Sequence, residues 1–164
     1  MARALIVGCG CRGRELGRGL LDDGWQVRGT TRSPDRVPDI EAADIEAVVA
    51  DPGRVGTVLD QVSDVTLLYW LLGSALGPPQ DVAALHGPWL ERLLTEIVDT
   101  PVRGFVYEGN GAVAAAQRER GGDLVRAAGS RWRIPVTVSR ADPGDWREWR
   151  DEMVAVATAL TDAG

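Results

Sequence analysis

The chain has 164 residues and a formal net charge of −6, which argues against nucleic acid as a partner. Hydrophobic residues make up 45% of it, a share typical of a protein that folds around a core. No apolar run approaches the roughly 20 residues that cross a bilayer, and we recognise no signal peptide. We therefore expect a cytoplasmic protein without a membrane partner.

All 18 basic residues are arginine, so no mechanism that needs a lysine is available to these residues. The two cysteines, Cys9 and Cys11, lie too close together in a tight loop to pair with each other. A metal site would need further ligands, and His86 is the only histidine. We expect no metal and interpret the cysteines as loop residues, with redox sensing as the alternative.

Short apolar runs alternate with longer amphipathic segments along the chain. Strands are expected at residues 3–7, 25–30, 45–50, 65–72, 102–107 and 135–139. Helices are expected at residues 14–23, 54–61, 81–99, 112–128 and 145–160. The helix at 81–99 has apolar residues at i, i+4 spacing. For the helix at 112–128, the alternative is a break at Gly121 and Gly122.

This alternation predicts an α/β protein, with a six-stranded parallel sheet and helices on both faces. The elements fit the doubly wound strand order 3-2-1-4-5-6 of the Rossmann fold. We expect residues 1–164 to form one dinucleotide-binding domain with no separate substrate domain.

The strongest motif is Gly8-Cys9-Gly10-Cys11-Arg12-Gly13, a G-x-G-x-x-G segment between the first strand and the first helix. Gly8 permits a tight turn, Gly10 lets the backbone approach a pyrophosphate, and Gly13 lets the helix pack close to the sheet. The amides at the start of the helix would hold the phosphates. The motif predicts a dinucleotide site, with S-adenosylmethionine as the main rival ligand.

The end of the second strand favours NADP over NAD. An NAD site needs a carboxylate there for the ribose 2′-hydroxyl, but no Asp or Glu occurs before Asp35. Arg32 can bind a 2′-phosphate instead, although it can also be an ordinary surface arginine. The missing carboxylate also disfavours a methyltransferase. Other side chains that can reach the phosphate are Thr31, Ser33, Arg12 and Arg36.

Residues at the carboxyl ends of the later strands complete the predicted site, because ligands of open α/β sheets bind there. Asp51 ends the third strand and can bond the adenine or cap the next helix. Tyr69 and Trp70 end the fourth strand and are expected at the cofactor. Tyr107 is the candidate proton donor, with Glu108 or Asn110 as helpers; the alternative for each tyrosine is a half-buried strand residue.

The segments Leu5-Ile6-Val7-Gly8-Cys9-Gly10 and Thr31-Arg32-Ser33-Pro34 resemble the atypical, extended-type short-chain dehydrogenase/reductases, a group related to NAD-dependent epimerases. Residues 48–51, 64–69 and 135–140 are similar too. The resemblance implies NAD(P) binding through Gly8, Gly10, Gly13 and Arg32. The family's usual catalytic pair is Tyr-x-x-x-Lys, which a chain without lysine cannot form.

The sequence thus predicts an NADP(H)-binding oxidoreductase of a minimal, atypical form that acts on an unknown small-molecule substrate. The alternatives are a non-catalytic NADP-sensing regulator and an S-adenosylmethionine-dependent methyltransferase. Trp146 and Trp149, with Met153, form an apolar face on the last helix. This face can pack on the sheet, form a homodimer seam or act as a lid over the site.

Overall fold

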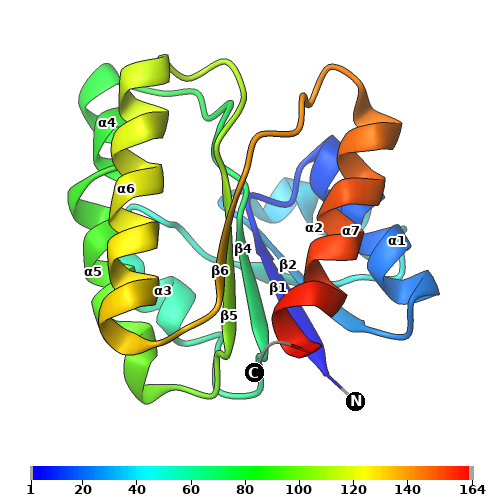
Figure 1. Ribbon diagram of the computed structural model, residues 1–164. Coiled ribbons are helices and arrows are strands. Elements are labelled where there is room, and N and C mark those ends of the chain that lie inside the picture. The colour runs from blue at the N-terminus through cyan, green and yellow to red at the C-terminus, as the bar shows by residue number, and fades with distance from the viewer. Residues whose placement is uncertain (1, 163–164) are drawn as a thin grey trace.

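The computed structural model describes residues 2–162, which form a parallel sheet between two layers of helices (Figure 1). The strand order is β3-β2-β1-β4-β5-β6, which confirms the predicted Rossmann topology. The strands are β1 (Arg3–Val7), β2 (Gln26–Thr31), β3 (Glu46–Val49), β4 (Leu67–Trp70), β5 (Gly104–Glu108) and β6 (Val136–Ser139).

Helices α3, α4, α5 and α6 cover one face of the sheet, and α1, α2 and α7 cover the other (Figure 1). The helices are α1 (Cys11–Asp22), α2 (Val37–Glu41), α3 (Val55–Leu59), α4 (Pro79–Leu85), α5 (Pro88–Glu96), α6 (Ala115–Trp132) and α7 (Trp146–Asp162). The short helices η1 (Pro34–Arg36) and η2 (Ile97–Asp99) precede α2 and follow α5. Among residues 2–162, no helix combines the length and the apolarity needed to cross a membrane.

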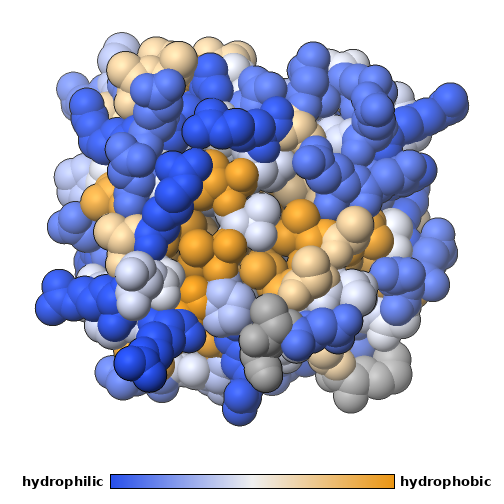
Figure 2. Space-filling view, in the orientation of Figure 1, coloured by the Kyte–Doolittle hydropathy of each residue, from blue (hydrophilic) through white to orange (hydrophobic). Residues whose placement is uncertain are grey.

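The central strands β1, β4 and β5 are apolar on both sides because a helical layer covers each face of a parallel sheet. Each of these strands is buried almost throughout. The edge strand β6 is different, since Val136, Thr137 and Val138 are only partly buried. Figure 2 shows hydrophobic surface on this side of the molecule, surrounded by hydrophilic residues.

The helix predicted at residues 81–99 is two helices, α4 and α5, separated by His86 and Gly87. Pro88 explains the break, because proline in a helix interior lacks the amide hydrogen and clashes with the preceding turn. It occupies the first position of α5 instead. Leu93 and Ile97 still face the core as the apolar spacing predicted.

The helix predicted at residues 112–128 is confirmed as α6, and Gly121 and Gly122 do not interrupt it. A Cβ atom at Gly121 would collide with the hydroxyl of Tyr107, and one at Gly122 would lie 3.3 Å from Val138. The two glycines therefore let α6 approach β5 and β6 closely.

Candidate functional site

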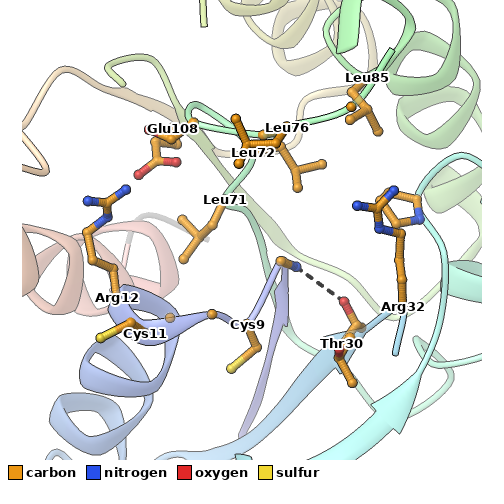
Figure 3. Close-up of a pocket in the computed structure, with 18 of the residues that line it drawn as sticks. Cys9, Cys11, Arg12, Thr30, Arg32, Leu71, Leu72, Leu76, Leu85 and Glu108 are labelled. Carbon is orange, nitrogen blue, oxygen red and sulfur yellow. Dashed lines mark hydrogen bonds between the residues drawn. The ribbon is translucent and has the colours of Figure 1, made fainter. Parts of the chain in front are cut away.

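A cavity of about 1050 Å³ opens at the carboxyl ends of the strands. Its walls are the loops that follow β1 to β4, the last residue of β5, Pro143 from the loop after β6, and parts of α1, α4, α5 and α7. The loop after β1 lies at its floor, between Arg12 and Arg32 (Figure 3). β1 and β4 are neighbours in the sheet, and this is where the strand order reverses and where ligands bind in doubly wound folds.

The three glycines of the loop after β1 each meet a different steric demand. Gly8 has φ of +87°, and a Cβ atom there would lie 2.7 Å from the carbonyl oxygen of Leu71. Gly10 has open space where a side chain would be, so a ligand can approach its backbone. At Gly13 a Cβ atom would lie 3.2 Å from the carbonyl oxygen of Gly8, which keeps the helix close to the strand.

The amino end of α1 leaves backbone amides free for an anion. Its N-cap, Gly10, provides no side-chain cap, and no acidic residue lies in the first turn. Arg14 N donates to Gly10 O at 2.9 Å, so the amides of Cys11, Arg12 and Gly13 precede the first such bond. The helix dipole adds partial positive charge at the same place.

The two cysteines are both free thiols in different environments. Cys9 is buried beneath the loop, and burial raises the pKa of its thiol to about 12. Cys11 is exposed and lines the cavity. Within residues 2–162, no three His, Cys, Asp or Glu side chains are grouped so that they could hold a metal ion.

Arg32 follows β2 and lies at one side of the cavity, exposed to solvent (Figure 3). Its guanidinium forms no ion pair or hydrogen bond with the residues from 2 to 162. Arg36 also lines the cavity, and its Nη1 forms an ion pair with Asp39 Oδ2 at 3.6 Å. Thr31 lines the cavity too, whereas Ser33 does not; the Thr31 hydroxyl accepts the Ser33 amide at 3.2 Å.

Asp51 lines the cavity after β3 and shapes the turn there. Its Oδ1 accepts a hydrogen bond from Gly53 N at 2.8 Å. The following helix, α3, has Arg54 as its N-cap residue, so the interpretation of Asp51 as a helix cap is wrong. The prediction that Asp51 bonds adenine stays open.

Glu108 and Arg12 lie at the other side of the cavity from Arg32 (Figure 3). The Arg12 guanidinium points toward the Glu108 carboxyl group, so the structure does not bring Arg12 to the Arg32 end. Glu108 ends β5, is only 4% exposed and accepts a hydrogen bond from Gly73 N at 2.9 Å. Burial raises the pKa of Glu108, and the Gly73 amide and the Arg12 charge partly oppose this rise.

Three aromatic residues predicted at the site lie in the core and do not line the cavity. The Tyr69 hydroxyl donates to Met153 O at 2.7 Å, and Trp70 Nε1 donates to Leu85 O at 3.1 Å. Tyr107 is fully buried between β5 and α6. The sequence placed these residues on the correct strands, but their side chains point into the helical layers rather than into the cavity.

Trp146 and Trp149 contribute to the wall formed by α7. Trp149 is 1% exposed and packs in the core, as one of the three interpretations expected. Trp146 is 39% exposed, and the guanidinium carbons of Arg147 and Arg150 lie 5.2 and 5.4 Å from its ring centroid. Sequence reasoning missed the apolar part of the wall, because short apolar stretches give no sign of which side they line. It consists of residues 71, 72, 75–78, 82, 85 and 89.

No known protein family matches the sequence, and no curated protein matches it. Solved structures do match. A UDP-glucuronic acid 4-epimerase from Bacillus cereus, in complex with NAD, has a TM-score of 0.68 and 16% identity, covering 85% of this chain and 56% of its own. A triphenylmethane reductase from Citrobacter sp., complexed with NADP(H), has a TM-score of 0.63 and 14% identity, with coverages of 82% and 48%.

The BdcA (YjgI) structure from E. coli has a TM-score of 0.73 and 18% identity, and the match covers 97% of this chain and 89% of that one. The chain thus spans about half the length of the epimerase and the triphenylmethane reductase. At such low identities these similarities establish the fold alone, in agreement with the Rossmann strand order.

Proposed function

We propose that the chain binds NADP(H) in this cavity and is an oxidoreductase of the short-chain dehydrogenase/reductase type. The observation that carries the proposal is the position of Arg32, an exposed guanidinium without an ion pair in residues 2–162, in the same cavity as the glycine loop. β2 ends in Thr31 without the carboxylate that would repel a 2′-phosphate.

The cavity fits an extended dinucleotide. Arg32 would hold the 2′-phosphate with a charge-assisted hydrogen bond, and Asp51, which lines the same cavity, would bond the adenine. The pyrophosphate would meet the amides of residues 11–13, beside the open space at Gly10. The nicotinamide half would then extend to Glu108, at the side opposite Arg32.

A nicotinamide cofactor supplies a hydride acceptor or donor when it is bound. The chain's own residues must bind the substrate, exclude water and exchange a proton with it. No lysine is present for the family's usual Tyr-x-x-x-Lys pair, and both tyrosines are buried away from the cavity. The solved neighbours that bind NAD or NADP(H) support the cofactor class but not the substrate.

The test is a titration with NADPH and NADH, followed by quenching of tryptophan fluorescence, in wild type and Arg32→Ala. Loss of one charge-assisted contact should weaken NADPH binding about 10- to 100-fold and change NADH binding little. Arg103→Ala is the matched control, because Arg103 is exposed at the amino end of β5, away from the cavity. Equal NADPH affinity in Arg32→Ala and wild type would refute the role of Arg32.

A further inference from the structure

We propose that Glu108 is an acid–base group that changes its protonation with the redox state of the bound cofactor. The inference rests on the proposed function, since the nicotinamide lies near Glu108 only if the 2′-phosphate lies at Arg32. It goes further by assigning the proton chemistry to a residue that no family pattern identifies.

The geometry sets Glu108 apart from the other carboxyl groups of the cavity. Asp51 accepts a turn amide and Glu15 accepts the Arg18 guanidinium, while Asp81, in α4, is only partly buried. Glu108 is only 4% exposed, yet it reaches the cavity from the end of β5. Gly73 N bonds its Oε1, and none of the hydrogen bonds within residues 2–162 uses its Oε2.

A second buried polar group faces the same space. Trp149 lines the cavity, and its buried indole N–H has no hydrogen-bond partner of good geometry within residues 2–162. It lies close enough to Glu108 to lower the pKa of that carboxyl group. A buried polar group without a hydrogen-bond partner is costly, so the indole N–H is a donor that stands available beside Glu108.

The charges around Glu108 permit both protonation states. Arg12 approaches from α1 and favours the carboxylate, whereas burial favours the carboxylic acid. Arg118, from α6, is held by carbonyl oxygens of Gly109 and Val113 at 2.7 Å. The neighbouring Tyr107 is neutral, since burial raises its pKa.

Reduction of a carbonyl compound illustrates the use of such a group, because it adds a hydride to carbon and a proton to oxygen. Glu108, as a carboxylic acid, gives its proton to the oxygen and becomes a carboxylate. The oxidised nicotinamide ring carries a positive charge, so the new carboxylate gains a favourable partner. Solvent returns the proton after the products leave, and the reverse reaction uses the carboxylate as the base.

The experiment measures the dissociation constants of NADP⁺ and NADPH between pH 5.5 and 8.5, and takes their ratio at each pH. The 2′-phosphate titrates in both ligands, so its effect cancels. In wild type the ratio of NADP⁺ to NADPH constants should fall on the order of tenfold as pH rises, because the carboxylate attracts only the charged ring. Glu108→Gln, which can still accept the Gly73 amide, should make the ratio independent of pH.

Two further variants sharpen the result. Arg12→Leu should move the midpoint of the pH dependence upward, because the guanidinium favours the carboxylate. Glu91→Gln, at an exposed position of α5, should behave as wild type. If both nucleotides bind and Glu108→Gln keeps the wild-type pH dependence, the inference is wrong while the cofactor proposal stands. If neither nucleotide binds, the proposed function itself fails.

Discussion

The Tyr107 hydroxyl donates a hydrogen bond to His86 Nδ1, 2.5 Å away, and the two rings meet edge to face. Nε2 of the same histidine bonds the carbonyl oxygen of Leu72 at 2.9 Å. The pair therefore joins β5, the junction of α4 and α5, and the cavity wall after β4. These two hydrogen bonds hold the backbone at Leu72, which lines the cavity, from the side of the protein core.

Replacing Tyr107 with phenylalanine should lower the free energy of unfolding by about 1–3 kcal/mol, because His86 Nδ1 would stay buried without a donor. Urea denaturation at pH 7.5 measures this loss. The affinity for NADPH should change less than twofold, since Tyr107 does not line the cavity. A large loss of affinity with unchanged stability would show that Tyr107 acts at the ligand after all.

His86 should make the protein less stable in mild acid. Burial lowers its pKa below the ordinary value of 6.5, so below pH 6.5 the unfolded chain takes up a proton that the folded chain refuses. The free energy of unfolding should fall by up to about 1.4 kcal/mol per pH unit until the folded-state pKa is reached.

Glu108, whose pKa is raised, acts in the opposite direction, so the histidine effect is isolated by comparison with His86→Gln. Urea denaturation of wild type and this variant at pH 7.5 and 5.5 gives the difference. The free energy of unfolding of wild type should exceed that of His86→Gln by less at pH 5.5 than at pH 7.5. An advantage that is constant or grows would contradict a buried neutral histidine.

The contact between α6 and β5 should tolerate no methyl group at Gly121. Gly121→Ala should destabilise the fold by about 1–3 kcal/mol, because the new Cβ collides with the Tyr107 side chain. Gly56→Ala in α3 meets open space and should stabilise by about 0.5–1 kcal/mol. Thermal unfolding of the two variants should therefore shift in opposite directions, and equal shifts would mean that α6 lies farther from the sheet.

Two glycines of the loop after β1 should differ in their effects on stability and on NADPH binding. Gly10→Ala adds a methyl group in open space, so stability should change by less than about 1 kcal/mol while NADPH binding weakens tenfold or more. Gly8→Ala should lower both the stability and the NADPH affinity, because the positive φ of Gly8 and the Leu71 carbonyl exclude a side chain. Unchanged NADPH affinity in Gly10→Ala would place the pyrophosphate elsewhere.

The fold was predictable because its signals are local. The apolar run of β1 and the glycines after it predict the first loop of the site. The alternation of apolar runs and amphipathic segments predicts the other strands and helices. The glycines of α6 suggested a break because the residues that require them, Tyr107 for Gly121 and Val138 for Gly122, lie on strands distant in sequence. Pro88 was a visible signal for the break between α4 and α5, which the i, i+4 apolar spacing concealed.

The site was predictable only in part, for a reason that lies in the sheet. Most residues of a buried parallel strand are apolar or aromatic, so periodicity does not tell which side chain reaches the cavity. Tyr107 and Glu108 are adjacent at the end of β5, and only Glu108 reaches the cavity. The useful signal was a carboxylate at the end of an otherwise apolar strand. Ionisable groups are rarely buried without a partner or a function, so such a residue is a candidate for the site.

The most direct test of the central claim is a calorimetric titration of the wild-type protein with NADPH, NADH and S-adenosylmethionine at one pH and salt concentration. We expect NADPH to bind at least about tenfold more tightly than NADH, because only NADPH carries the phosphate that Arg32 can hold. We expect no heat from S-adenosylmethionine. Tight binding of S-adenosylmethionine, or no binding of either dinucleotide, would contradict the account.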